Sequence, residues 1–340
     1  MIATSNGAIV NALTVDVEDY YQVQSFAIDP RRWDDYESRV VANTHRVLRL
    51  FDEHQVRATF FILGWVAERF PRLVRDIHAS GHEIGCHSHR HRLIYEMTPD
   101  EFADDLARAT SAVGTVTGEP VVAFRAPTFS ITQKSLWALD VLIEQGYRYD
   151  SSVFPVYHDN YGIPGAPRFP YRIAKGDATG GGEKGTGAFC AEHPQGLAGK
   201  RCLSPLLAPG LVEFPPSVYR FLGYNLPVSG GGYFRLYPTG LSTYCLRRIN
   251  RRHGQPFMFY FHPWELDPDQ PRLPGSLKSR FRHYQNLART ETKLRRLLAT
   301  FPFGPMSQSL AASRGRRDNE EGAPADAVAA KPASLSRNER

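Results

Sequence analysis

The feature that most constrains the fold is a regular alternation of apolar strand-like and amphipathic helical segments over the first 150 or so residues. Apolar strand patterns lie at residues 11–17, 58–64, 82–88, 121–127 and 147–154, and helical patterns lie between them at residues 39–55, 68–81, 98–114 and 132–146. Strands separated by single helices at this spacing predict a parallel sheet, either open or closed into a barrel.

The later part of the chain departs from this pattern and then returns to it. Residues 175–210 are rich in glycine and poor in large apolar side chains, so we expect an exposed, flexible insertion. Residues 211–300 again contain strand and helix patterns, the last of which is one amphipathic helix over 276–300. From residue 307 to 340 large apolar side chains are scarce, and we expect a disordered tail. Residues 8–300 are therefore the predicted folded domain.

Charge and cysteine content narrow the function classes. The net charge is only +6 and the arginines are dispersed, which does not indicate a nucleic-acid partner. The four cysteines form no CxxC pair, a pattern typical of reduced thiols in a cytosolic protein, although Cys190 and Cys202 lie close enough to pair in an oxidising compartment. We find no secretion signal and no apolar run of membrane-spanning length. The chain is predicted to be cytoplasmic, with peripheral attachment to the inner face of the membrane left open.

Polar side chains collect where the predicted strands end. They are Asp16, Glu18 and Asp19 after the first strand, His87 to His91 after the third, Arg125 after the fourth and Asp150 at the fifth. Because reactive groups of parallel sheets gather at the carboxyl ends of the strands, we expect these residues to share one site.

The segment HSHRH, residues 87–91, offers two pairs of imidazole ligands. If the strand ends at His87 and the chain turns, His87 and His91 can face one point; if the strand continues, His87 and His89 share a face. Two histidines with one carboxylate and open positions suit a hydrolytic zinc or a ferrous ion. Strand alternation puts Glu18 on the face of Asp16, while Asp19 is one step further on.

Two further residues have types suited to catalysis. His262 follows an apolar strand, where a proton donor with a shifted pKa is useful, and Arg125 precedes a proline-stiffened turn, where it can orient a carboxylate. Each pattern also has a plain structural interpretation: a solvated histidine loop, a charged strand exit, a hydrogen-bonded core histidine and a surface ion pair.

The segments LTVDVEDYY, GHEIGCHSHRH, FRAPTFS, YDSSVFP and FYFHPWE resemble, in this order, the five motifs of the NodB-homology polysaccharide deacetylases, carbohydrate esterase family 4. GGYFRLYP and HPWEL are similar to segments of the branch associated with exosortase and exopolysaccharide loci. The resemblance implies a distorted (β/α) barrel and a metal-dependent N-deacetylase of an N-acetylated polysaccharide or its lipid-linked precursor. Other exopolysaccharide assembly proteins are implied as possible partners.

Carried over by position, the resemblance implies roles for single residues. Asp16 would be the catalytic base, Arg125 would hold it, and His262 would be the general acid. Asp150 falls in the region of the fourth motif and is included with the catalytic residues. His87 and His91 would bind the metal, most simply zinc, with cobalt, nickel or iron as alternatives.

The first motif departs from the family, because Val17 follows Asp16 where a second aspartate is usual. The third metal ligand would then be Glu18 or Asp19. His82 and His89 match no family role, and we expect them near the ligands or facing solvent. The departure also keeps two other functions open: a metal-free carbohydrate-binding or scaffold protein, and a ureide amidohydrolase of the same fold.

Overall fold

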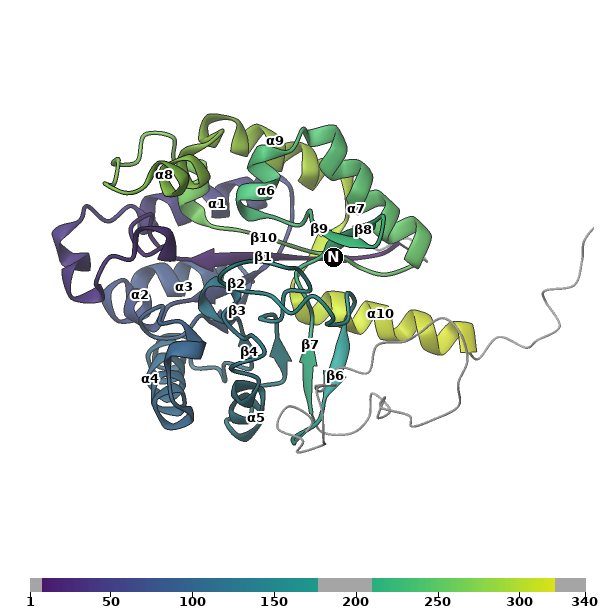
Figure 1. The fold of residues 1–340 in the computed structure, drawn as a ribbon, viewed down its shortest axis with the longest axis horizontal. Helices are drawn as coiled ribbons and strands as arrows, with labels where there is room; N and C mark the ends of the chain where they lie inside the picture. The colour runs from purple at the N-terminus through teal and green to yellow at the C-terminus, as the bar shows by residue number, and fades with distance from the viewer. Residues whose placement is uncertain (1–7, 177–209, 322–340) are drawn as a thin grey trace, which may run out of the picture.

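One curled sheet organises the part of the chain that the computed structural model describes, residues 8–176 and 210–321 (Figure 1). The strand order is β10-β1-β2-β3-β4-β5-β7-β6, with β11 also paired to β1, and β6 alone is antiparallel to its neighbour. The strands are β1 (Asn11–Val17), β2 (Thr59–Ile62), β3 (Glu83–Cys86), β4 (Ala123–Phe124), β5 (Tyr149–Asp150), β6 (Tyr171–Ile173), β7 (Leu211–Glu213), β10 (Met258–Phe261) and β11 (Phe303–Gly304). The predicted distorted barrel is confirmed in the form of a curled half-barrel.

Helices connect the parallel strands, and a small hairpin lies outside the main sheet. The helices are α1 (Val40–Glu53), α2 (Gly64–Arg69), α3 (Pro71–Ala79), α4 (Pro99–Thr117), α5 (Trp137–Glu144), α6 (Gly231–Leu236), α7 (Thr239–His253), α8 (Leu277–Tyr284), α9 (Leu287–Thr300) and α10 (Met306–Glu321). The hairpin is β8 (Val218–Phe221) with β9 (Tyr224–Pro227), and short 3-10 turns are η1 (Gln24–Phe26), η2 (Pro30–Asp35), η3 (Ile94–Glu96), η4 (Pro127–Phe129) and η5 (Pro263–Leu266). None of the helices in the described ranges is long and apolar enough to cross a membrane.

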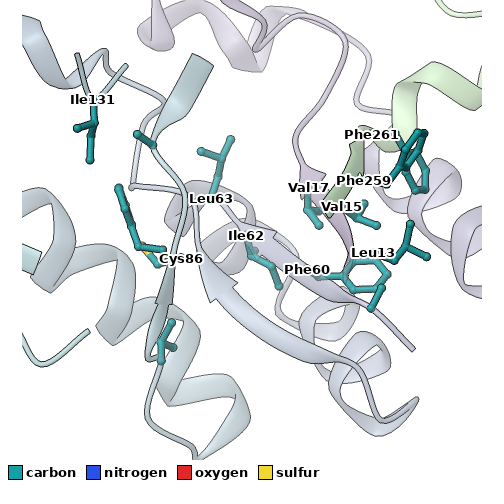
Figure 2. Packing of buried hydrophobic residues seen from close by; sticks show 14 of the residues in the cluster. Leu13, Val15, Val17, Phe60, Ile62, Leu63, Cys86, Ile131, Phe259 and Phe261 are labelled. Atoms are coloured by element: carbon teal, nitrogen blue, oxygen red, sulfur yellow. The ribbon is translucent and has the colours of Figure 1, made fainter. Parts of the chain in front are cut away.

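The two faces of β1 have different tasks. Leu13, Val15 and Val17 pack with apolar side chains of β2, β10 and the surrounding helices in the main core (Figure 2). Because side chains alternate along a strand, Asp16 points to the opposite, concave face, where Ala12 packs in a smaller cluster. An apolar core on one face therefore fixes the orientation of the acid on the other.

The register of the sheet brings the predicted site residues to one edge. Val15 pairs with Phe261, so His262 follows β10 beside Asp16. Cys86 pairs with Phe124, so the next residues, His87 and Arg125, leave their strands at the same level.

The capping box predicted for the helix at residue 98 is confirmed at the start of α4. The Thr98 hydroxyl accepts from the backbone N–H of Glu101, and the Glu101 carboxylate accepts from the backbone N–H of Thr98. These bonds satisfy N–H groups that a helix start leaves unpaired.

The single helix predicted over 276–300 is wrong, because the chain breaks into α8 and α9. Asn286 adopts a left-handed conformation with φ 56° between them. The guanidinium of Arg235 donates to the carbonyls of His283 and Gln285, and the Asn286 side chain donates to the carbonyl of Arg235. The end of α8 is therefore held by α6, a tertiary contact that helical periodicity does not reveal.

The predicted disordered tail is wrong up to residue 321, because α10 covers that segment. Met306 and Leu310, one helical turn apart, are buried against the concave face of the sheet, and the Ser309 hydroxyl donates to the carbonyl of Val10. Two apolar side chains at the correct spacing are enough to dock the start of this helix. Residues 322–340, and residues 177–209 of the predicted insertion, lie outside the described residues.

Candidate active site

Three predicted ligands converge where β1 and β3 end. One ligand atom each from Glu18, His87 and His91 lies within 4.8 Å of the others, and all three residues are buried. The Oε2 of Glu18 lies 2.8 Å from the Nε2 of His91, and the two imidazole rings are 5.3 Å apart between centroids.

The turn after β3 decides between the two histidine pairs. Ser88 and His91 take left-handed conformations with φ 66° and 53°, and the Ser88 hydroxyl accepts from the backbone N–H of His91. This turn brings His91 back toward His87. His89 points elsewhere, and its Nε2 lies 3.1 Å from the carboxylate of Glu68 on α2.

His82 and His89 are both buried, which excludes the solvent-facing alternative of the two that we expected. The Nδ1 of His82 accepts from the backbone N–H of Ala58, and its ring packs against Phe60 at 4.8 Å between centroids. His82 therefore packs just before β3, at the opposite end of the strand from the turn, and His89 packs against α2.

The donor chemistry of the cluster fits a divalent ion. The Nδ1 of His87 lies 2.8 Å from the carbonyl oxygen of Arg125, to which it can only donate, so Nε2 keeps its lone pair for a metal. Burial lowers the pKa of His87 to about 4, which keeps the ring neutral as a ligand must be. Burial alone would raise the pKa of Glu18, but the neighbouring imidazoles, His91 first, outweigh it and lower this pKa to about 2. Two imidazoles and one carboxylate form a common catalytic zinc set.

Asp19, the alternative third ligand, is turned away from this cluster. Its Oδ2 accepts from the Ser38 hydroxyl and from the backbone N–H groups of Arg39 and Val40 at the start of α1. Burial raises the pKa of Asp19 to about 6 despite these bonds. The structure favours Glu18 as the ligand and gives Asp19 the task of holding α1.

Asp16 and Arg125 form a buried ion pair on the concave face. The Nη1 of Arg125 lies 2.7 Å from the Oδ1 of Asp16 and also donates to the Thr14 hydroxyl. Its other nitrogens donate to the carbonyl and hydroxyl of Ser151, and the guanidinium lies 4.4 Å from the ring centroid of Phe61. Arg125 is fully buried and fixes the orientation of the Asp16 carboxylate.

His262 lies beside both Asp16 and the ligand cluster. Its Nε2 lies 3.7 Å from the Oδ2 of Asp16 and 3.5 Å from the Oε1 of Glu18. Burial acts to lower the pKa of His262, but three neighbouring carboxylates, Glu18 and Glu265 foremost, raise it to about 9. The ring is therefore charged at neutral pH and able to donate a proton.

Glu265 and Arg235, which hold His262 in place, were not among the predicted site residues. Glu265 accepts from the Nδ1 of His262 at 2.8 Å and from the Nε of Arg235 at 2.7 Å, and both Glu265 and Arg235 are buried. The signals were present as a glutamate three residues after His262 and as an arginine within the apolar segment GGYFRLYP.

Asp150, which we included with the catalytic residues, does not line the pocket that Asp16, Glu18, His87, His91 and His262 line. It pairs in register with Phe124, one residue before Arg125, and so faces the opposite side of the sheet. There it lies against Glu213. Burial raises the pKa of Asp150 to about 6, and burial together with the charge of Asp150 raises the pKa of Glu213 well above its usual value. The assignment of Asp150 to catalysis is corrected on this ground.

The site opens into a pocket of about 440 Å³. The aromatic side chains of Phe129, Tyr161 and Trp264 are among those that line it. Tyr20 and Tyr21, which follow β1, belong to a buried aromatic cluster. The Trp264 ring stacks on His262 with centroids 5.2 Å apart, so one wall of the pocket carries the proton donor.

Two family models match separate parts of the chain. Residues 32–149 match the model described as polysaccharide deacetylase, and residues 200–311 match one described as a domain of unknown function, DUF3473.

Known proteins are similar to parts of the chain. A peptidoglycan-N-acetylglucosamine deacetylase of Bacillus cereus is 32% identical over 98 residues, covering 28% of this chain and 36% of that protein. A peptidoglycan deacetylase of Helicobacter pylori is 26% identical over 133 residues, covering 39% and 41%. The chain thus spans less than half the length of these two relatives.

One solved structure covers the whole chain. It is a candidate polysaccharide deacetylase of Mycobacterium smegmatis, with a TM-score of 0.54 at 20% identity, covering 100% of this chain and 98% of that one. At this identity the likeness concerns the fold. Residues 32–149 are thus similar to polysaccharide deacetylases, and the fold is similar to that of the Mycobacterium smegmatis protein.

Proposed function

We propose that this protein is a metal-dependent hydrolase that removes N-acetyl groups from an N-acetylated polysaccharide, or from its lipid-linked oligosaccharide precursor, in exopolysaccharide biosynthesis. Deacetylation is supported by the relatives, which are named as deacetylases of peptidoglycan. The exopolysaccharide context is supported by the GGYFRLYP and HPWEL segments, both of which lie in the region matched by DUF3473.

The observation that carries the proposal is the convergence of Glu18, His87 and His91 in the same pocket as Asp16 and His262. A carboxylate and a charged imidazole lie beside the three-ligand cluster, and amide hydrolysis without a covalent intermediate uses two such proton-transfer groups.

The roles follow from the atoms that each residue presents. Glu18, His87 and His91 would hold a divalent ion, which would supply Lewis-acid chemistry to the acetamide carbonyl and to the attacking water. The Oδ1 of Asp16 is held by Arg125, which leaves Oδ2, on the side of His262, to accept the proton of that water.

His262 completes the reaction by protonating the leaving amine. Its Nδ1 is held by Glu265, so Nε2 carries the proton that faces the pocket. Transfer of this proton to the amine nitrogen releases acetate and a free amino sugar, with Asp16 and His262 acting as separate base and acid.

We further propose that residues 8–300 act as one catalytic unit. Asp16, His87 and Arg125 come from the first half of the chain, and Arg235, His262 and Glu265 come from the region matched by DUF3473. Neither half supplies both proton-transfer groups by itself.

Acetate release from N-acetylhexosamine oligosaccharides tests the proposal. We expect release by the metal-loaded protein, loss on chelation, recovery on adding back zinc, and loss in Asp16→Asn. Full activity of His87→Ala would contradict the ligand assignment.

Acetate release, measured together with metal content and sugar affinity, separates the two rival functions. A carbohydrate-binding or scaffold protein would hold no stoichiometric divalent ion, and His87→Ala would leave its affinity for sugars intact. A ureide amidohydrolase would hydrolyse allantoin-type substrates and release no acetate.

A further inference from the structure

The charged side chains that line the pocket differ between its two ends. The acidic residues that line the pocket are Asp16 and Glu18, both of which belong to the candidate active site. Toward α8, the charged side chains of the lining are Lys278 and Arg282, and His158 also lines the pocket. Within the described ranges, this end of the pocket is therefore basic.

The backbone of Arg282 is held by a hydrogen bond, and its side chain is exposed. The Nη2 of Arg235 donates to the carbonyl of Arg282, and the same guanidinium holds Glu265 behind His262. The basic end and the proton donor thus rest on one buried arginine. Helix α8, the yellow-green helix at the upper left of Figure 1, lies above the end of the sheet where the active site is found.

The charged residues at this end of the pocket are mostly cations. Lys278 has one acidic neighbour, Asp159, at 3.9 Å, and both side chains are largely exposed. Burial lowers the pKa of His158, and the charges of Arg282 and Lys278 lower it further, while the charge of Asp159 raises it.

An aromatic surface lies beside these cations. The His158 ring stacks on Tyr161 with centroids 3.8 Å apart and an interplanar angle of 12°. Rings that lie flat in a pocket wall can receive the apolar face of a sugar, and adjacent cations can bind a charge on that sugar.

On these contacts, and resting on the proposed function, we propose that Arg282, Lys278 and His158 form a subsite for an anionic group of the substrate. The group is a carboxylate or phosphate carried by the glycan beyond the N-acetylated sugar at the metal ligands. A uronic acid in the chain and the phosphate of a precursor present the same chemistry, and the cations at this subsite serve either.

Three matched ligands test the subsite: a neutral N-acetylated trisaccharide, the same trisaccharide with one uronic acid, and the same trisaccharide with a reducing-end phosphate. Binding is measured by calorimetry on Asp16→Asn protein, in which turnover is blocked. We expect at least one anionic ligand to bind about tenfold or more tightly than the neutral one, since charge-assisted hydrogen bonds are strong. The better of the two identifies the source of the anion.

Arg282→Gln, added to the same background, should remove this preference and leave the neutral ligand within about twofold. Arg280→Gln is the control, because Arg280 is an exposed arginine of the same helix that does not line the pocket. Equal affinity for neutral and anionic ligands, or equal losses in the two arginine variants, would overturn the subsite. Absence of acetate release by wild-type protein would instead refute the proposed function and leave the binding result standing.

Discussion

The Nδ1 of His262 lies 2.8 Å from the Oε1 of Glu265, three residues further along the same 3-10 turn. Arg235 holds the other carboxylate oxygen of Glu265 at 2.7 Å. Glu265, held in this way by Arg235, fixes the ring orientation of His262. The negative charge of Glu265 also contributes to the raised pKa of that ring. Glu265 is therefore a positioning residue for the proposed proton donor.

Replacing Glu265 with glutamine should lower kcat by about 10- to 100-fold, within the usual contribution of general acid catalysis. The basic limb of the pH–rate profile should move to lower pH, because a carboxylate that raises the pKa of His262 is lost. Steady-state kinetics across pH, with metal content as a check, measures both. Glu68→Gln is the control, since Glu68 contacts His89 outside the pocket. An unmoved profile would contradict the role of Glu265.

Glu18→Gln and Asp19→Asn should have opposite effects. Glu18→Gln should lose stoichiometric zinc, because it removes the only carboxylate in the described ligand cluster. Asp19→Asn should keep zinc but unfold about 1–2 kcal/mol more easily, because it weakens the bonds to the start of α1. Elemental analysis and urea unfolding separate the two, and loss of zinc from Asp19→Asn alone would reverse the assignment.

Removing Arg125 should leave the buried carboxylate of Asp16 unpaired. We expect Arg125→Met to lose about 3–5 kcal/mol of unfolding free energy, the usual cost of breaking a buried ion pair. Asp16→Asn with Arg125→Met should recover part of this loss and remain inactive. Chemical denaturation of the two single variants and the double variant gives the coupling free energy between Asp16 and Arg125. An Arg125→Met variant as stable as the wild type would argue against the ion pair.

His82 should make stability depend on pH. Its Nδ1 accepts a backbone hydrogen bond, and burial, with a smaller effect of Arg57, lowers its pKa from 6.5 to about 4. The unfolded chain therefore takes up this proton first, so the contribution is present above pH 6.5 and is lost as the pH falls toward 4. Between pH 7 and 5 the wild type should lose about 2 kcal/mol more than His82→Gln, from roughly 1.4 kcal/mol per pKa unit. Equal losses in denaturant titrations at the two pH values would exclude this role.

The order of strands and helices was predictable because burial on both faces of a parallel strand leaves an apolar run that local sequence shows directly. The same alternation put Glu18 on the face of Asp16. Alternation alone could not separate Asp150 from Arg125, because their relative orientation depends on the register between β4 and β5, in which Asp150 pairs with Phe124.

What could not be predicted depends on contacts between distant segments. Left-handed conformations at Ser88 and His91 select the ligand pair, and the bond from Arg235 to the end of α8 breaks the last amphipathic pattern. Glu265 gains its role from Arg235, which lies 30 residues earlier in the chain. None of these contacts leaves a periodic trace in the sequence.

The central claim is that two imidazoles and one carboxylate hold a single divalent ion, and X-ray absorption at the zinc edge on zinc-loaded protein tests it most directly. The account predicts one zinc per chain with two imidazole nitrogens at about 2.0–2.1 Å, remaining light ligands that are oxygen, and loss of one imidazole in His91→Ala. A shell that contains sulfur, an unchanged spectrum in His91→Ala, or the absence of stoichiometric zinc would contradict it.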